Sequence, residues 1–431
     1  MTASWFFLLV SLWGASFTWN VFRPRYAPAS AAALSFAAGW LTSELALHHI
    51  LWQAIMTVVF VWAGALAGWP GWLGLAITLA SWIGLAGWYG RAHEAAVAVE
   101  EALRFALGGD YLHRVDPVVR QRIEPRVNWR HLVAPVPFRP KVVERIRNVR
   151  YGREGGHDLH LDLYRHRDDR TRCPVLLQIH GGAWIAGSKN EQGLPLMLQV
   201  ASHGWLCVSI NYRLSPGATF PDPLIDVKRA IKWVREHIAE YGGDPEFLVL
   251  TGNSAGGQLA ALAALTSNDP EYQPGFEEVD TSVEGCIAFY GVYDLMNRHG
   301  QYHNPTLARI LEKHVMKSAR EDSPDAYHKA SPLSQVHADA PPFFVLHGDQ
   351  DTLVPVADAR YFADALRQRL HAPVAYAEIP GAPHCFEIIP SLRATFILHG
   401  VERFLAYLYA TRHDTRPVTR PERSRLRVVA S

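Results

Sequence analysis

The sequence has no excess of charge of either sign, and it has few cysteines. Its 431 residues carry 42 Lys and Arg against 41 Asp and Glu, so no basic excess marks it as a nucleic-acid binder. The apolar share of 49% excludes a disordered chain. The cysteines form neither a metal-ligand spacing nor a dense disulfide framework, because they lie far apart. They are Cys173, Cys207, Cys286 and Cys385.

Charge is almost absent from the first 90 residues, which hold only Arg23, Arg25 and Glu44 together with ten of the 14 Trp. A helix needs about 20 apolar residues to cross a bilayer, because every backbone polar group must be paired within the segment. Residues 50–90 are uncharged and are interrupted by Pro70-Gly71. We therefore expect a multi-pass cell-membrane protein with four spans, or three if the segment containing Glu44 does not cross. The expected spans are residues 5–22, 29–47, 50–69 and 72–89.

Two alternatives to this interpretation stay open. Residues 5–22 could be a signal peptide, although they lack a basic start and a small-residue cleavage site. Residues 50–90 could be a buried helical hairpin of a soluble protein. The side of the membrane is also undetermined, since Arg23 and Arg25 favour a cytoplasmic first loop, whereas Arg91 favours a cytoplasmic side after the last span.

A juxtamembrane region follows the apolar segment over residues 91–141. Residues 91–107 predict a helix ended by Gly108-Gly109, and several prolines then predict an irregular linker. Residues 91–153 hold 13 Lys and Arg against seven Asp and Glu, which suits either anionic headgroups or an ordinary solvated face. At the other end of the chain, residues 412–431 predict a basic disordered tail.

Residues 142–411 alternate between short apolar runs and helical segments. Runs of this kind are typical of strands buried on both faces of a mostly parallel sheet, so we expect an α/β fold. The expected strands are residues 142–149, 159–164, 175–179, 206–210, 248–250, 286–290, 343–346 and 374–379. The expected helices are residues 224–241, 255–265, 357–370 and 392–409. Chemistry in such a fold collects at the carboxyl ends of the strands.

A candidate nucleophile lies in Gly252-Asn253-Ser254-Ala255-Gly256, between an expected strand and an expected helix. A serine in this position sits on a sharp turn with its hydroxyl exposed, and the flanking glycines avoid clashes in the bend. We therefore expect Ser254 to be the nucleophile and place Asn253 in the substrate pocket. The alternative is a glycine-rich turn with a capping serine.

A second glycine-rich segment, His180-Gly181-Gly182-Ala183-Trp184, follows the expected strand 175–179. Backbone amides of such a turn can stabilise a developing oxyanion without side-chain obstruction. The expected donors are the amides of Gly181, Gly182 and Ala255. His180 precedes the nucleophile and is expected to brace this loop, while Trp184 either lines the pocket or packs in the core.

A serine hydroxyl needs an imidazole as base and a carboxylate to orient the imidazole. In this type of fold the order along the chain is serine, acid, histidine. Asp349 and Asp351 follow the expected strand 343–346, and His384 follows 374–379. We expect a triad of Ser254, Asp351 and His384, with Asp349 as the alternative acid.

These motifs resemble the hormone-sensitive-lipase-type branch of the α/β-hydrolase esterases, over about residues 142–408. Within that branch the chain is similar to bacterial membrane-anchored Lip esterases of the mycobacterial LipM and LipQ type, and also to prenylcysteine methylesterases. It departs from the usual motif at Asn253, where the branch has Asp, and its acid loop is similar to that of the peptidase and dienelactone-hydrolase branches. The motifs that carry the resemblance are His180–Trp184, Asn211-Tyr212-Arg213-Leu214, Tyr241-Gly242-Gly243-Asp244-Pro245, Gly252–Gly257, Ala330-Ser331-Pro332-Leu333 and His347–Pro355.

The resemblance implies hydrolysis of carboxylic esters through an acyl-enzyme, with no metal and no cofactor. We expect short- to medium-chain or lipid-derived esters as substrates, contact with a lipid bilayer, no nucleic-acid partner, and a cap over the acyl pocket at residues 294–335. The alternatives are an amidase or peptidase, for example one like an aryl-formamidase, and a catalytically silent binding module. No oligomeric state follows from the sequence.

Overall fold

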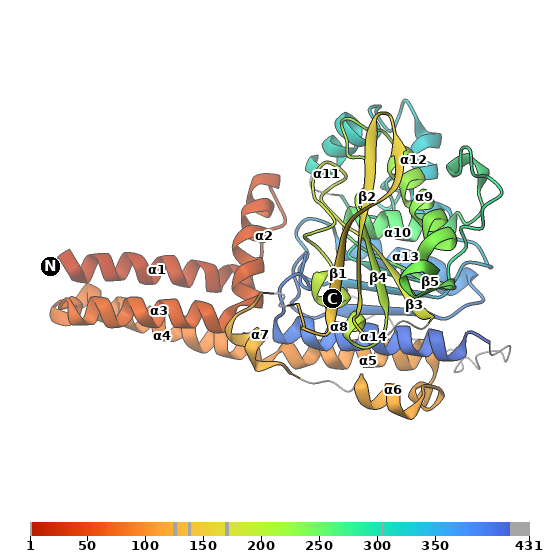
Figure 1. Ribbon diagram of the computed structural model, residues 1–431. Coiled ribbons are helices and arrows are strands. Elements are labelled where there is room, and N and C mark those ends of the chain that lie inside the picture. Colours follow the sequence, from red (N-terminus) through yellow and green to blue (C-terminus); the bar gives the residue numbers. More distant parts are fainter. Residues whose placement is uncertain (1, 124–126, 137–138, 169–171, 303–304, 414–431) are drawn as a thin grey trace.

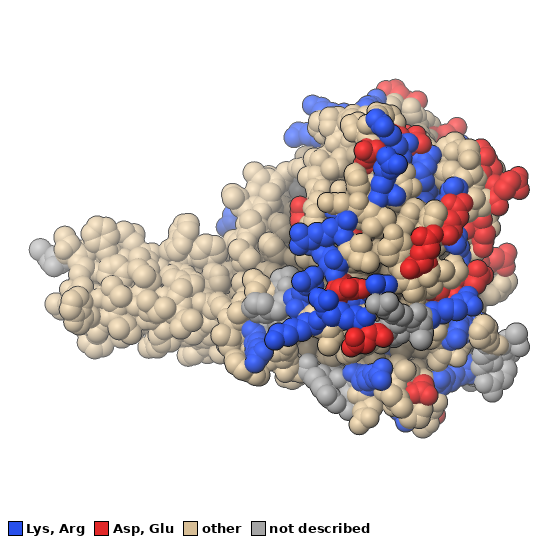
Figure 2. Space-filling model, viewed as in Figure 1, with Lys and Arg blue, Asp and Glu red and all other residues tan. Residues whose placement is uncertain are grey.

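The computed structural model describes residues 2–123, 127–136, 139–168, 172–302 and 305–413. They form a helical arm attached to an α/β body (Figure 1). In the arm, α1 (Thr2–Phe22), α3 (Ala46–Trp62) and α4 (Trp69–Gly90) lie side by side, and α2 (Ala29–Glu44) stands across their ends beside the body. The arm is almost free of charge, whereas Lys, Arg, Asp and Glu cover the visible face of the body (Figure 2).

Small polar residues lie where the helices of the arm meet. The hydroxyls of Thr18 and Ser81 are 2.6 Å apart, and Thr78 donates to Ser11 over 3.0 Å. Large apolar side chains point outward instead, and Trp62 is 90% exposed. Small residues between helices with large apolar residues outside are typical of helices packed within lipid, because close backbone approach replaces the hydrophobic effect there.

The expectation of four membrane spans is wrong for the described residues. Two helical segments, Thr2–Phe22 and Trp69–Leu107, are long and apolar enough to cross a bilayer. A third is possible only if α2 and α3 count as one span, and they meet at an angle of 91°. α2 leaves the direction of the other helices because it packs against the body through contacts described below.

The expected turn at Pro70-Gly71 is also misplaced. α3 already ends at Trp62, and the turn that follows contains Gly64 with φ +79°. Pro70 lies in the first turn of α4. Proline is well suited to this position, because its missing amide proton would have no partner there and its fixed φ matches the helix.

The body contains one eight-stranded sheet in the order β1-β2-β4-β3-β5-β6-β7-β8. β1 and β2 form an antiparallel hairpin, β2 pairs antiparallel with β4, and the other pairs are parallel. The α/β class and all eight expected strands are confirmed. The strands are β1 (Val143–Glu154), β2 (His157–His166), β3 (Cys173–Ile179), β4 (Leu206–Ile210), β5 (Gly243–Asn253), β6 (Gly285–Phe289), β7 (Phe343–Gly348) and β8 (Val374–Ile379).

Helices cover both faces of the sheet. Val175 and Leu177 of β3 belong to the core cluster of one face, and Leu176 belongs to the other, as the alternation of side chains along a strand requires. α9 (Asp222–His237), α10 (Ala255–Leu265) and α13 (Val356–Arg369) pack on the first face. α5 (Ala92–Leu107), α8 (Leu194–Ser202) and α14 (Leu392–Thr411) pack on the second. The short helices are α6 (Pro117–Arg122), α7 (Trp129–Val133), α11 (Pro305–Ile310) and α12 (Pro324–Ala330).

α5 packs against the body, whereas the sequence predicts a separate juxtamembrane region over residues 91–141. It ends at Gly108, which has φ +93°, as expected. Glu100 of α5 accepts a hydrogen bond from Arg403 of α14 over 2.7 Å. A Cβ on Gly400 would lie 2.0 Å from Val99, so only glycine allows these two helices to approach so closely.

The expected cap, residues 294–335, lies between β6 and β7. It contains α11, a π-helical turn at Leu311–Val315, and α12. Leu311 and Val315 are buried in the main core cluster, so one side of this segment is anchored to the body. In the expected tail, residues 414–431 lie outside the described residues.

Candidate active site

Ser254 stands on the sharp turn between β5 and α10, with φ 55° and ψ −119°. A non-glycine residue in this conformation is strained, and such strain is typical of functional positions. The neighbouring glycines make the turn possible. A Cβ on Gly252 would lie 2.1 Å from the Gly256 carbonyl oxygen, and one on Gly256 would lie 2.1 Å from that of Ile179.

The structure brings Ser254, Asp351 and His384 together. Nε2 of His384 lies 2.9 Å from Oγ of Ser254, and Nδ1 lies 2.5 Å from Oδ2 of Asp351. The three residues follow β5, β7 and β8, so all lie at the carboxyl edge of the sheet. A carboxylate at Nδ1 fixes the tautomer that leaves Nε2 free to accept the serine proton.

Asp351 is held in its ionised form. Its Oδ1 accepts hydrogen bonds from the amides of Leu353 and Val354, each over 2.9 Å. Nε2 of His347 lies 3.2 Å from Oδ2. Burial alone would raise the pKa of Asp351, but the charge of His384 and the hydrogen bonds from His347 and His384 outweigh it and hold that pKa well below its usual range.

The alternative acid, Asp349, has a different partner. Its Oδ1 accepts a hydrogen bond from the amide of Gly381 over 2.7 Å. This bond ties the loop after β7 to the loop that carries His384. Asp349 therefore braces the site, and Asp351 is the carboxylate that meets the imidazole.

The expected oxyanion donors lie beside Ser254, but they are not equivalent. The amide of Gly181 already donates to Oε1 of Gln192 over 2.6 Å. Among the described residues, the amides of Gly182 and Ala255 have no acceptor and remain available. Gly181 is still required for close approach, since a Cβ there would lie 2.5 Å from the carbonyl oxygen of Asn253.

His180 has the bracing position expected from the sequence. Its Nδ1 lies 2.7 Å from the carbonyl oxygen of Gly181, and its ring stacks on Tyr212 at 4.4 Å. Burial lowers its pKa, so the ring is held in the neutral form.

Neither residue assigned to the substrate pocket lines an open surface. Trp184 is 2% exposed, and its indole donates to Gln258 over 2.9 Å, so its core alternative is the one that fits. Asn253 is 1% exposed. Its amide donates to Glu387 over 2.6 Å, and its oxygen accepts from Gln178 over 2.6 Å. The polar atoms of both side chains are therefore hydrogen-bonded within the body.

Sequence reasoning missed a buried acid behind the triad. Glu387 accepts hydrogen bonds from the Tyr290 hydroxyl over 2.5 and 2.6 Å, and the Tyr290 ring lies 4.4 Å from the ring of His384. Burial raises the pKa of Glu387 to about 7, although the Tyr290 hydrogen bond opposes the rise. An acidic residue three positions after the expected catalytic histidine was the signal that could have identified it.

A contact from the arm was also missed. The ring of Phe36 in α2 meets the ring of His384 edge to face, with centroids 6.1 Å apart. The sequence could not suggest it, because the uncharged segment around Phe36 matched a membrane span.

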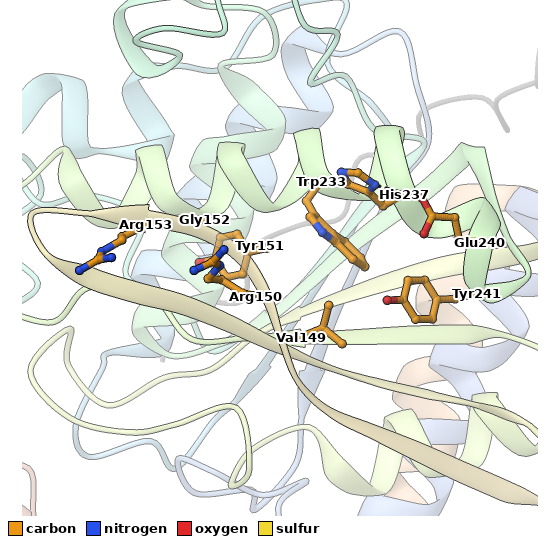
Figure 3. Close-up of a pocket in the computed structure, with 9 residues that line it drawn as sticks. All are labelled: Val149, Arg150, Tyr151, Gly152, Arg153, Trp233, His237, Glu240 and Tyr241. Atoms are coloured by element: carbon orange, nitrogen blue, oxygen red, sulfur yellow. Dashed lines mark hydrogen bonds and ion pairs between the residues drawn. The ribbon is translucent and has the colours of Figure 1, made fainter.

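A cleft lies elsewhere on the body. It has a volume of about 540 Å³ and opens between β1 and α9, where Tyr151, Trp233 and His237 line it (Figure 3). Its lining contains none of the expected site residues. A search for a binding site by this cleft alone would therefore miss the triad.

Comparisons with known proteins find esterases among the relatives of this chain. The BD-FAE family model matches residues 161–366. The chain is 53% identical to the probable carboxylic ester hydrolase LipM of Mycobacterium tuberculosis over 268 residues, which cover 62% of each protein. It is 40% identical to the esterase LipQ of the same organism over 394 residues, which cover 90% of this chain and 87% of LipQ.

More distant matches follow the same pattern. A probable isoprenylcysteine alpha-carbonyl methylesterase of Arabidopsis thaliana, ICMEL1, is 33% identical over 52% of this chain and 48% of its own length. A solved structure described as a truncated form of carbohydrate esterase from gut microbiota matches with a TM-score of 0.52 and 24% identity. That match covers 62% of this chain and 96% of the other, and it shows a shared fold.

Proposed function

The chain belongs to the esterase family that includes LipM and LipQ, and we propose that it is a serine esterase that cleaves carboxylic esters through an acyl-enzyme on Ser254. One observation carries the proposal: a single imidazole, that of His384, lies within hydrogen-bond reach of both Ser254 and Asp351. This is the arrangement that turns a weakly nucleophilic hydroxyl into a nucleophile at neutral pH.

In the first half of the reaction, Nε2 of His384 takes the proton of Ser254 as Oγ attacks the ester carbonyl. The ionised Asp351 stabilises the imidazolium that forms. The amides of Gly182 and Ala255 donate to the oxyanion of the tetrahedral intermediate. His384 then returns the proton to the leaving alcohol, and the acyl group stays on Ser254.

In the second half, a water molecule replaces the alcohol. His384 takes a proton from this water as it attacks the acyl-enzyme, the same amides stabilise the second oxyanion, and the proton returns to Ser254 as the acid leaves. The triad and the backbone donors are sufficient for both halves.

The esterase would be attached to a membrane by α1 and α4. The apolar composition of α1, α3 and α4 supports this, as does the outward orientation of side chains such as Trp62. In membranes washed with alkaline carbonate, the full chain should stay in the pellet and be released by detergent. Recovery in the carbonate supernatant would contradict attachment by spanning helices.

Labelling with a fluorophosphonate tests the nucleophile. The full chain should be labelled on Ser254, and Ser254→Ala should abolish both labelling and ester turnover. Ser267→Ala, two residues past the end of α10, is the matched control and should keep both. Labelling that persists in Ser254→Ala would overturn the proposal.

Matched ester and amide substrates with the same acyl group separate an esterase from an amidase or peptidase. We expect kcat/KM for the ester to exceed that for the amide by at least a hundredfold. Equal values would contradict the assignment as an esterase.

A further inference from the structure

α2 touches the candidate site with successive turns. The hydroxyl of Thr352, in the acid loop, donates to the carbonyl oxygen of Ala32 over 3.1 Å. One turn later, Phe36 meets the ring of His384. Another turn later, the indole of Trp40 donates to the carbonyl oxygen of Cys385 over 2.9 Å. One stripe of a single helix, with a spacing of four residues, therefore covers the acid loop and the histidine loop.

The opposite face of α2 is exposed, and it is apolar except for Ser30 in the first turn. Leu34 is 72% exposed and Leu41 is 43% exposed, and Ala33 and Ala37 lie beside them. No charged residue occurs between Arg25 and Glu44. A contiguous exposed apolar surface normally marks a site of contact with another apolar surface. Protein covers one side of α2. The exposed apolar side chains on its other side would be more stable against an apolar medium than in water.

The C-terminal end of α2 is fixed to the body. Glu44 forms a buried ion pair with Arg393, and Ser391 donates to Glu44 over 2.6 Å. The guanidinium of Arg393 also lies 5.9 Å from the ring centre of Trp88 in α4. Breaking a buried pair of this kind is costly, so α2 keeps its place relative to the triad.

α2 runs across the direction of the other arm helices. It meets α3 at 91°, and α1, α3 and α4 lie side by side in the arm (Figure 1). If the arm crosses the bilayer, α2 lies in the plane of the interface. α3 also exposes apolar side chains, and Val58, near its far end, is 69% exposed.

We propose that α2 is an interfacial helix that joins the bilayer to the ester site, with Leu34 on the lipid side and Phe36 as a wall of the site beside His384. The substrate class is then a membrane-resident ester with a long acyl chain, rather than a small water-soluble ester. The apolar chain packs against Phe36 while the ester carbonyl lies between Ser254 and the oxyanion donors. This inference rests on the proposed esterase function and specifies its substrate.

The test compares two substrates in the same preparation. The full chain is reconstituted in phosphatidylcholine vesicles, and kcat/KM is measured for p-nitrophenyl dodecanoate and p-nitrophenyl butyrate. Phe36→Ala should lower the ratio of dodecanoate to butyrate about tenfold, mainly through KM, because an apolar contact to the chain is lost. Phe36→Leu should restore most of the ratio. Leu34→Gln, on the exposed face, should also lower the ratio by reducing contact with lipid.

Val58→Ala is the control, since it removes a similar exposed apolar side chain from α3, away from the site. It should leave both rates unchanged. Fluorophosphonate labelling of Ser254 is measured in every variant. An unchanged ratio in Phe36→Ala and Leu34→Gln, with Ser254 still labelled, would overturn this inference alone. Failure of the unsubstituted chain to be labelled on Ser254 and to cleave either ester would overturn the proposed function and this inference with it.

Discussion

Glu44 at the end of α2 and Arg393 at the start of α14 form a buried ion pair across 349 residues of sequence. Their side chains are 0% and 3% exposed, so each charge depends on the other for stabilisation. The pair joins the arm to the body directly behind the loop that carries His384. The helical arm is therefore part of the structure that holds the site, in addition to any role in attachment.

Removing one member of this pair should destabilise the whole chain. We expect Glu44→Gln to lower the free energy of unfolding by about 3 kcal/mol, because it leaves the Arg393 charge buried without a partner. Replacing both residues, as Glu44→Leu with Arg393→Met, should recover much of the loss. Thermal unfolding in detergent measures both variants. Equal stability of Glu44→Gln and the unsubstituted chain would contradict a buried pair.

The two loop carboxylates should respond differently to substitution. Asp351→Asn should lower kcat for ester hydrolysis about 10⁴-fold, because the wrong imidazole tautomer would face Ser254. Asp349→Asn should lower kcat much less, since it weakens only the hydrogen bond from the Gly381 amide. Steady-state kinetics on one ester checks both, and a larger loss in Asp349→Asn would reverse the assignment of the acid.

The buried acid behind the triad should give stability a distinct pH dependence. Glu387 has a folded-state pKa of about 7, above its ordinary value of 4.5. Between these values the folded state keeps the proton while the unfolded state loses it, so the contribution of this group falls as pH rises from 4.5 to 7. Relative to Glu387→Gln, the unsubstituted chain should lose about 3 kcal/mol over this range. Parallel slopes of the unfolding free energy against pH would show that Glu387 does not titrate in this way.

The substitution Asn253→Asp also tests the hydrogen bonds around Glu387. The substitution places a second carboxylate next to Glu387, where the Asn253 amide now donates over 2.6 Å. Two buried carboxylates at this distance disfavour ionisation. We expect the variant to be less stable at pH 8 than at pH 5 when each is compared with the unsubstituted chain. Asn253→Asp combined with Glu387→Gln should remove this difference.

The turn at Ser254 should not tolerate a methyl group at Gly252. Gly252→Ala would place a Cβ 2.1 Å from the carbonyl oxygen of Gly256, so the turn must open and Ser254 must move away from His384. We expect at least a hundredfold loss of esterase activity, measured alongside circular dichroism. Gly109→Ala, where a Cβ meets nothing within 4 Å, is the control and should retain activity.

The sequence was sufficient to predict the body of the fold and the meeting of Ser254, Asp351 and His384 at one edge of the sheet. Strands buried on both faces carry apolar runs, so β3 to β8 could be recognised in the sequence. Ser254, Asp351 and His384 each follow one of these strands. The glycine-rich turns were equally readable, because a tight bend restricts which residues fit.

Other features depend on contacts that leave no local signal. α2 has the composition of a spanning helix, but its direction is set by partners such as Arg393 and Cys385, more than 300 residues away. Trp184 is held by its hydrogen bond to Gln258, and Asn253 by its hydrogen bond to Glu387. The residue types alone do not identify these hydrogen-bond partners.

The most direct test of Ser254 as the nucleophile is to trap the acyl group during turnover. The full chain is mixed with p-nitrophenyl butyrate, quenched in acid within the first turnovers, digested and analysed by mass spectrometry. A butyryl group is expected on the peptide that contains Ser254. Ester cleavage without an adduct on Ser254, or an adduct on another residue, would contradict this role of Ser254.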